Sequence, residues 1–306
     1  MNEYLIVLNK DEDSLSLVDL STKSEIKKIK TAHNPHEIAI TPDGKKSYIT
    51  CSLGNVINVM ENDNFTIVKT IEHEAFHFPH GVAVTPDGKF LFVASTFSNM
   101  IFIIDTRKDQ IVKHFPTYQL YSHMIALSPD GKTIFVPNIG SDNITVIDVE
   151  KQAIANHFPV GAGPEGVAVH PDGKALYVAN QKEDTLYIID TESCKTLYER
   201  KLGSVPIRIV FSRNGQYAFI PNRISGDLSV IQSNFLVKDR KEPWEIKRIP
   251  LGIWPGGLVF DQQDKFAYVA NNKTNDISII NIELMKEMPD RIKVGVHPDG
   301  LGYLVK

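Results

Sequence analysis

The amino-acid sequence predicts an all-β fold, a seven-bladed β-propeller of four-stranded blades that takes up residues 1–306 as a single domain. Three observations predict it: an apolar phrase ending in a Pro-Asp-Gly turn recurs, short strands follow it at even spacing, and each chain end holds part of one repeat. Repeats of about 40–45 residues with four strands each are typical of propeller blades, because each blade has two apolar faces that only its neighbours can cover.

The turn is the clearest mark of the repeat. Intact copies of Pro-Asp-Gly-Lys lie at residues 42–45, 86–89, 129–132 and 171–174. Degraded copies follow at Arg213-Asn214-Gly215 and at Gln263-Asp264. Proline sets φ for the turn and glycine supplies a positive φ, so each copy is expected to join the first two strands of a blade as a hairpin.

The other strands of a blade follow each turn in a fixed order. In one repeat the second strand covers residues 176–180 and ends in a small polar residue, the third covers 185–190, and the fourth covers 196–200. This alternation with a period of two, and the near absence of a helical period, predicts four short strands per repeat.

The two ends of the chain determine the number of blades. The chain begins in the second strand of a blade, Tyr4 to Leu8, and finishes with a lone first strand, Pro298 to Leu304. We expect the last strand to pair beside the first, which closes the ring and removes its exposed sheet edges. Six complete blades and one composite blade give seven.

The strand that follows each turn also carries a family resemblance. Leu176-Tyr177-Val178-Ala179-Asn180 and Ala267-Tyr268-Val269-Ala270-Asn271, together with the Pro-Asp-Gly-Lys turns, resemble the YVTN-type β-propeller repeat family, which includes lactonase-like seven-bladed propellers. The resemblance covers essentially the whole chain and implies the fold. It leaves the function open, because that family includes surface proteins, binding proteins and lactonase-like enzymes.

Composition narrows the class of partner. Lys and Arg number 33 against 37 Asp and Glu, a net charge of -4, so we expect a small-molecule ligand or substrate, with neither nucleic acid nor membrane as partner. The first residues lack the features of a signal peptide, which predicts a cytoplasmic location, or an extracellular one if a leader has been removed. We also expect a monomer. Cys51 and Cys194 are expected on opposite faces as free thiols.

One position of the repeat stands out chemically. In a propeller the first strand of each blade lines the central channel, and the residue that opens it sits at one mouth of that channel. We call these seven residues the ring positions: His36, His80, His123, Glu165, Ile207, Gly256 and Asp299. Three consecutive blades thus carry His, the next carries Glu, and the composite blade carries Asp.

These side chains predict a metal site. Ligands on adjacent inner strands can converge on the propeller axis, whereas neighbours along one strand point to opposite sides. We expect His36, His80, His123 and Glu165 to bind a divalent transition metal (Zn, Fe or Mn), since imidazoles with one carboxylate suit these metals better than Ca²⁺ or Mg²⁺. The alternative is a polar, water-filled channel mouth without a metal.

Three charged residues complete the predicted site. Arg208 follows the ring position of its blade and is expected either to bind a substrate carboxylate or phosphate or to pair with a neighbouring acid such as Glu165. Asp299 and Glu37 are the candidate general bases. For Glu37 we favour the role of an ion-pair partner between blades.

Other residues near the same mouth are expected to be mainly structural. The second strands end at Asn9, Cys51, Ser95, Asn138, Asn180, Asn222 and Asn271. Side chains of this kind commonly satisfy loop backbone groups. His77 and His297 are candidates for contacts behind the ligands, and Tyr121 and Trp254 are expected either to wall the site or to pack at the rim.

Together these features predict a metal-dependent hydrolase, lactonase or lyase that acts on a small polar molecule at the channel mouth. The alternative is a non-enzymatic binding or scaffold propeller for a protein or a small ligand. The sequence has no Gly-x-Ser-x-Gly, no Walker-type loop and no dinucleotide fingerprint, so the chemistries that those motifs serve are not indicated.

Overall fold

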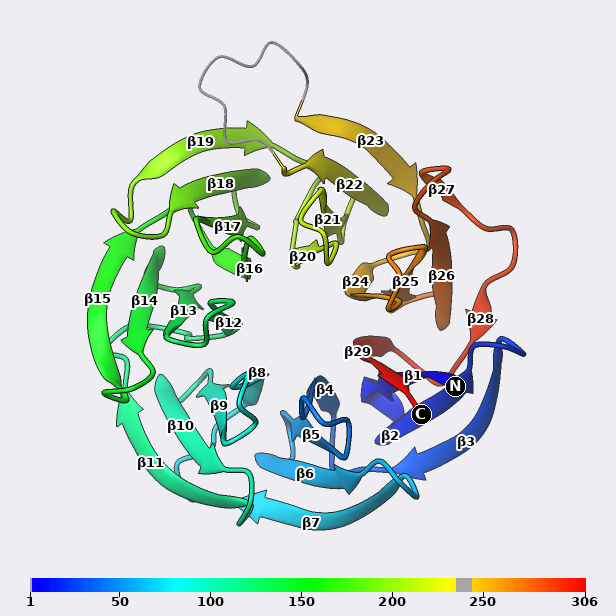
Figure 1. The fold of residues 1–306 in the computed structure, drawn as a ribbon, viewed down its shortest axis with the longest axis horizontal. Helices are drawn as coiled ribbons and strands as arrows, with labels where there is room; N and C mark the ends of the chain where they lie inside the picture. The colour runs from blue at the N-terminus through cyan, green and yellow to red at the C-terminus, as the bar shows by residue number, and fades with distance from the viewer. Residues whose placement is uncertain (1, 235–243) are drawn as a thin grey trace.

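The chain folds into a ring of seven antiparallel sheets around a central axis, as the sequence predicts (Figure 1). The computed structural model describes residues 2–234 and 244–306. We number the blades along the chain: blade 1 is the composite blade with strand order β29-β1-β2-β3, and blades 2 to 7 follow, each starting with its innermost strand.

The inner two strands of each blade run from the axis outward in chain order, except in blade 1. The innermost strands are β29 (Pro298–Val305), β4 (Pro35–Ile40), β8 (Pro79–Val84), β12 (Ala126–Leu127), β16 (Pro164–Val169), β20 (Val210–Phe211) and β24 (Pro255–Phe260). The second strands are β1 (Glu3–Asn9), β5 (Lys46–Cys51), β9 (Phe90–Ser95), β13 (Thr133–Asn138), β17 (Ala175–Asn180), β21 (Tyr217–Asn222) and β25 (Phe266–Asn271).

The outer two strands complete each blade, and the 3-10 turn η1 (Lys10–Glu12) joins β1 to β2. The third strands are β2 (Ser14–Asp19), β6 (Val56–Glu61), β10 (Met100–Asp105), β14 (Asn143–Asp148), β18 (Thr185–Asp190), β22 (Asp227–Gln232) and β26 (Asp276–Asn281). The outermost are β3 (Ser24–Lys30), β7 (Thr66–Glu72), β11 (Gln110–Pro116), β15 (Ala153–Pro159), β19 (Thr196–Lys201), β23 (Glu245–Pro250), and the short pair β27 (Lys286–Glu287) and β28 (Ile292–Lys293).

Ring closure follows the predicted scheme. Strand β29 pairs antiparallel with β1, with Leu304 opposite Tyr4 and Tyr303 opposite Leu5, so the two ends of the chain lie side by side in blade 1 (Figure 1). The backbone N–H of Asn2 also donates to the carbonyl of Lys306 at 2.7 Å. The last strand therefore forms the innermost strand of the blade that the N-terminus begins.

Hydrophobic cores fill the space between neighbouring blades. One of them packs Tyr48 and Ile57 of blade 2 against Val93 and Phe102 of blade 3, all fully buried. Corresponding cores recur around the ring. Because each sheet is covered by the adjacent sheets, the ring is a rigid frame on which loops at either end can vary.

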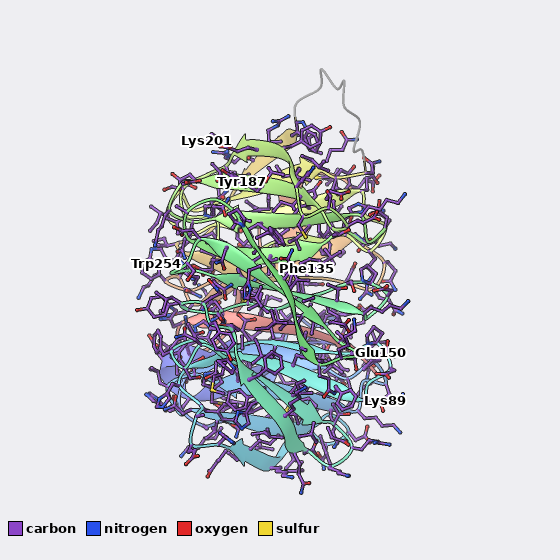
Figure 2. All side chains as sticks on the ribbon, turned by 90° about the vertical axis from the view of Figure 1, so that its left-hand side faces the viewer. Lys89, Phe135, Glu150, Tyr187, Lys201 and Trp254 are labelled. Carbon is purple, nitrogen blue, oxygen red and sulfur yellow. The ribbon has the colours of Figure 1, made fainter. Side chains whose placement is uncertain are left out.

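One flat side of the ring carries the Pro-Asp-Gly hairpins, and we call it the turn face. The turns are locally stabilised: the Thr85 hydroxyl donates to Asp87 at 2.7 Å, and Gly88 has the positive φ (+71°) that the hairpin requires. Figure 2 shows the ring from its edge, with Lys89 and Glu150 on this face and Trp254 on the opposite one.

The opposite side is the mouth face, where loops of consecutive blades are tied together. The residue two before each ring position has a left-handed backbone with φ of 58–64°: Asn34, Phe78, Tyr121, Gly163, Val205, Trp254 and His297. In six blades its N–H donates to a carboxylate or amide oxygen of the preceding blade, from Asp13, Asn55, Asn99, Asp142, Asp184 or Asn275. We call this contact the loop clamp; Gly226 stands in its place before Trp254.

The cysteines are free, as expected. Cys51 ends β5 on the mouth face, where burial raises the pKa of its thiol to about 12. Cys194 lies in the turn between β18 and β19 at the other end of the sheet. Among the described residues, no helical segment has the length and hydrophobicity needed to cross a membrane.

Candidate functional site

The ring positions meet at a cavity of about 250 Å³ on the propeller axis. Six of the seven line it: His36, His80, His123, Glu165, Ile207 and Asp299. Gly256, the seventh, packs beside Asp299, since a Cβ there would lie 3.1 Å from Oδ1 of that carboxylate. The register of the repeat therefore brings these side chains together, as the sequence predicts.

Close approach of the inner strands depends on glycine directly after the ring position. A Cβ on Gly81 would lie 2.4 Å from the carbonyl oxygen of His123, and one on Gly300 would lie 2.4 Å from that of His36. Both distances are far inside van der Waals contact. Glycine at these places lets neighbouring strands converge until ring residues of different blades touch.

A bulge changes which side chains reach the axis. The expectation that neighbours along one strand point to opposite sides is wrong here, because both His36 and Glu37 line the cavity. The ladder between β4 and β5 shifts register between Pro35 and Glu37, and such a bulge redirects the side chains around it.

An ion pair between two blades that are not neighbours spans the channel. Arg208 of blade 6 donates from both terminal nitrogens to the carboxylate of Glu37 in blade 2, with Nη1 3.1 Å from Oε2. Burial alone would raise the pKa of Glu37, but the Arg208 guanidinium outweighs it and lowers that pKa. Glu37 is thus an ion-pair partner across the ring, as we favoured, and the partner of Arg208 is Glu37 rather than Glu165.

A second ion pair lies within blade 1. Lys10, in η1, places Nζ 2.6 Å from Oδ2 of Asp299 and 3.2 Å from Nε2 of His36. Burial would raise the pKa of Asp299, but the Lys10 ammonium outweighs it and holds that pKa well below its usual range. The Asp299 carboxylate is therefore ionised and already engaged.

Glu165 differs from the other two acids. Its nearest cationic partner is Arg223, whose Nη2 lies 3.9 Å away, and no hydrogen bond reaches its carboxylate from the part of the chain that the structure describes. Burial raises the pKa of Glu165 despite the opposing effect of Arg223. Two lowered carboxylates and one raised carboxylate in one cavity form a pattern that assigns acid and base roles in active sites.

The three histidines form a stack on one side of the cavity. The ring centroids of His80 and His123 lie 3.7 Å apart, and those of His36 and His80 lie 4.2 Å apart. Burial lowers the pKa of all three, that of His123 to about 3, so the imidazoles are neutral near pH 7. The Thr96 hydroxyl contacts Nδ1 of His123 at 3.1 Å and fixes the orientation of that ring.

Several buried nitrogens in this site lack a partner within residues 2–234 and 244–306. They are Nδ1 of His36, Nδ1 of His80, Nε of Arg208 and Nε of Arg223. Buried polar atoms normally have a hydrogen-bond partner, so four such nitrogens on residues that line one small cavity favour a polar ligand there. The two arginine N–H groups can only donate, which favours an anionic ligand.

The structure brings only some of the predicted metal ligands within reach of a common ion. His36, Glu37 and His80 can place one ligand atom each within 4.8 Å of the others. His123 and Glu165 line the same cavity. Neutral imidazoles are competent ligands, but Lys10 already contacts His36 and Arg208 already engages Glu37.

The other predicted residues lie outside the cavity. The strand-end asparagines bond within their own blades, as where Asn271 donates to Asp276 and Ser278. The two aromatic residues lie at the rim: Tyr121 is half exposed, and Trp254 has the Arg223 guanidinium 5.9 Å from its ring centroid.

The two remaining histidine candidates also lie outside the cavity lining. The His77 side chain is exposed. His297 bonds to Asp11 and Asn272. Neither residue therefore contacts the ligand atoms of the candidate site directly.

Sequence reasoning missed five lining residues, namely Lys10, Phe78, Met124, Ile139 and Arg223. Lys10 and Arg223 each follow the last residue of a second strand, so an alignment of that next position would have found two cations. Phe78 occupies the left-handed position two before a ring residue, where a bulky side chain is unusual.

Two family models match the sequence. One, described as a lactonase with a seven-bladed β-propeller, matches residues 116–294. The other, described as a YNCE-like β-propeller, matches residues 2–155. Each match covers at least half of the chain. No curated protein matches the sequence significantly.

Solved structures of varied function share the fold. The periplasmic gluconolactonase PpgL of Pseudomonas aeruginosa superposes with a TM-score of 0.82 at 16% identity, covering 100% of this chain and 99% of its own. A 6-phosphogluconolactonase assigned as putative in Bacteroides fragilis gives 0.80 at 16% identity, with 99% and 98% covered. Hydrazine synthase of Kuenenia stuttgartiensis gives 0.80 at 22%, with 89% and 90% covered. Identities this low show a shared fold and no more.

Proposed function

This chain belongs to the family of lactonase-like seven-bladed β-propellers, and from that premise we propose that it hydrolyses a small anionic lactone in the cavity at the channel mouth. Two structures of similar fold carry gluconolactonase names, which supports this class of reaction. The observation that carries the proposal is the set of four unpartnered buried nitrogens around one cavity.

The proposed roles follow from the ion pairs. Glu37 and Asp299 are held by Arg208 and Lys10, so the carboxylate with the raised pKa, Glu165, is the better general base. This assignment differs from the sequence-based candidates Glu37 and Asp299 for a physical reason: a base that is already ion-paired accepts a proton less readily.

The reaction can then be written with these groups. Glu165 takes a proton from water as the water oxygen bonds to the lactone carbonyl carbon, and neutral N–H groups of the histidines stabilise the oxyanion. The ring C–O bond breaks, and the leaving alkoxide takes the proton back from Glu165. The product is the open hydroxy acid, which releases its acidic proton to solvent and becomes the hydroxycarboxylate. The Nε–H groups of Arg208 and Arg223 hold the anionic group of the substrate.

The test is lactone hydrolysis followed by acid release in a pH-stat. With an anionic lactone the wild type should be active, and Glu165→Gln should lower kcat at least about 100-fold. Glu192→Gln, an exposed acid in the turn between β18 and β19, is the control and should keep full activity. Full activity of Glu165→Gln would refute the assigned base, and a wild type inactive on every anionic lactone tried would refute the proposed reaction.

The pH profile gives a second readout. A general base works when ionised, so kcat/KM should fall as the pH falls through the raised pKa of Glu165. Arg223 lowers that pKa, so Arg223→Gln should move the acidic limb to higher pH. An acidic limb that stays in place in this variant would mean that another group titrates.

A metal site is the second candidate function, favoured by the short distances within His36, Glu37 and His80. A divalent Zn, Fe or Mn ion there would act as a Lewis acid on the substrate carbonyl. Calorimetry with each ion should show stoichiometric binding that His80→Ala abolishes and His77→Ala, outside the cavity, leaves intact. No binding at micromolar concentrations would exclude the metal and leave the carboxylate mechanism or a binding propeller.

A further inference from the structure

The rim of the cavity carries a cluster of aromatic rings at blades 3 and 4. Phe78 lines the cavity, and its ring stacks on that of His80 at 5.9 Å between centroids with 11° between the planes. The Phe97 ring lies 4.9 Å from that of Phe78, and Tyr121 lies 5.9 Å beyond Phe97. We call these three rings the aromatic wall; blades 3 and 4 supply them.

The backbone holds the wall in an unusual conformation. Phe78 and Tyr121 have φ of 60° and 59°, in the left-handed region where bulky side chains are rare. Loop clamps from Asn55 and Asn99 fix both residues. The other five blades have Asn34, Gly163, Val205, Trp254 or His297 at this position, so residues of several kinds adopt this conformation here. Aromatic residues on two consecutive blades are therefore not a requirement of the loop.

The wall is also exposed. Phe97 is 60% exposed and Tyr121 is 47% exposed. Below them, Met124 and Ile139 of blade 4 add apolar surface to the cavity itself. Contiguous exposed apolar surface at a cavity mouth is typical of a ligand-binding groove.

Apart from this wall, the cavity is lined by three cations (Lys10, Arg208 and Arg223) and three carboxylates (Glu37, Glu165 and Asp299). Arg208 and Arg223 come from blade 6, and among the described residues each still has a buried Nε–H without a partner. A ligand that satisfies both sides needs an anionic group at one end and a flat apolar group at the other. Polyhydroxy ligands suit the wall less well, because its rings offer a single hydroxyl, that of Tyr121.

We propose that the aromatic wall binds a planar apolar ring of the ligand, so that the substrate is an anionic lactone carrying an aromatic or unsaturated substituent rather than a bare sugar lactone. That the ligand is a lactone rests on the proposed function. The recognition itself, an anionic group held by arginine with a planar group stacked on the wall, does not require hydrolysis.

The test is therefore a binding measurement. Calorimetry of the whole chain uses 2-naphthoate, a planar aromatic carboxylate, and gluconate, a polyhydroxy carboxylate of the kind a sugar lactone yields. We expect 2-naphthoate to bind at least about tenfold more tightly. Phe97→Ala should weaken 2-naphthoate about tenfold, and Phe97→Trp should restore it. Ile253→Ala is the matched control, since Ile253 is 58% exposed in blade 7, away from the wall.

The outcomes separate the two proposals. Tighter binding of gluconate, no binding of 2-naphthoate, or an unchanged affinity in Phe97→Ala would overturn the aromatic wall as a binding surface, even if lactones are hydrolysed. Selective 2-naphthoate binding that depends on Phe97, in a protein that hydrolyses no lactone, would support the wall and refute the proposed reaction. A thermal unfolding curve of Phe97→Ala that matches the wild type shows that the loss is local.

Discussion

The two faces of the propeller satisfy their polar groups in different ways. On the turn face the solution is local and repeated: Thr41 donates to Asp43, and Thr85 donates to Asp87, each two residues away. On the mouth face the loop clamps also repeat, but the contacts at the cavity are long-range and differ from blade to blade, as where Arg208 reaches Glu37, 171 positions away in the chain.

The difference shows where to look for function in a repeat protein. Blades 2 to 7 each join their two inner strands by a hairpin, so the turn residues stay similar from blade to blade, with four intact copies and two degraded ones. At the mouth the blades share one cavity, and each can contribute a different side chain to it, such as Lys10, His80 or Glu165. Divergence among equivalent positions, rather than their likeness, marks the candidate site.

The largest effect should come from breaking the ring that both faces depend on. Deletion of residues 297–306 removes β29, which is the inner strand of blade 1 and contacts β24 and β4 on either side. We expect loss of the cooperative thermal transition, because two blades lose a covered face and β1 gains an open edge. Circular dichroism melting checks this; an unchanged melting temperature would contradict the closure.

The sequence predicts the repeated features of the fold better than the contacts at the mouth face. The hairpins, the strand order and the closure depend on local patterns and on the repeat, so each could be read before the structure. The meeting of His36 and His80 followed from register alone. The pairing of Glu37 with Arg208 did not, because it joins blades that are not neighbours and depends on how far two side chains reach across the channel.

Two further features of the site escaped sequence reasoning. The bulge at Pro35 brings Glu37 to the axis, although side chains along a regular strand alternate between its two sides. No sequence pattern predicted this bulge. Arg223 lies just beyond the end of β21, outside the ring positions. A site formed by several blades therefore needs the geometry of the inner strands as well as their alignment.

The next largest effect should come from the pair across the channel. Glu37→Gln removes the carboxylate that is bonded to the buried Arg208 guanidinium, and we expect a loss of about 3–5 kcal/mol in the free energy of unfolding. Urea denaturation measures it. The double variant Glu37→Leu with Arg208→Met should recover most of that loss, since it removes both charges. A loss below about 1 kcal/mol in Glu37→Gln would show that the pair is solvated.

A pH effect of intermediate size should come from the histidine stack. His123 has a folded pKa of about 3 against an ordinary value of 6.5, so between these values the unfolded state binds more protons. Stability should therefore fall as the pH falls through this window, by roughly 2 kcal/mol per such histidine between pH 7 and pH 5. Urea unfolding of His123→Gln at both pH values should show a smaller fall.

The control for this prediction is an exposed histidine. His33→Gln should leave the fall in stability unchanged, because the His33 side chain is 60% exposed. Equal pH dependence in wild type and His123→Gln would contradict a neutral buried imidazole at position 123.

A smaller effect should come from one loop clamp. Asn99→Gly keeps the left-handed backbone of that residue but removes the oxygen that accepts from the Tyr121 N–H at 2.7 Å. We expect a loss of about 1 kcal/mol in the free energy of unfolding. On the turn face, Asp87→Asn keeps its acceptor oxygen and should change stability by less than about 0.5 kcal/mol. Equal losses in the two variants would mean that the clamps add nothing beyond a local turn.

The smallest expected effect is a gain in the free energy of unfolding. It tests whether a loop clamp can stabilise the one blade of the mouth face that has Gly226 in its place. Gly226 holds the place of the clamp residue before Trp254, with φ of +68°, a conformation that Asn tolerates. Within residues 2–234 and 244–306, a Cβ there would meet only the Gly252 carbonyl at 3.5 Å, an ordinary contact. Gly226→Asn should therefore bond the Trp254 N–H and raise the free energy of unfolding by about 0.5–1 kcal/mol, since it also restricts the unfolded chain.

The matched control for that gain lies on the turn face. Gly215 has the same φ of +68°, but its Cβ would lie 2.9 Å from Nε2 of His170. That ring is buried and held by the contact of Nε2 with the Gly215 carbonyl at 2.9 Å, so it cannot move aside without losing the bond. Gly215→Asn should therefore destabilise the protein where Gly226→Asn stabilises it. If urea denaturation gave both variants the same sign, backbone conformation alone would decide the outcome, and the clamp would not be the reason that Asp and Asn recur at this place.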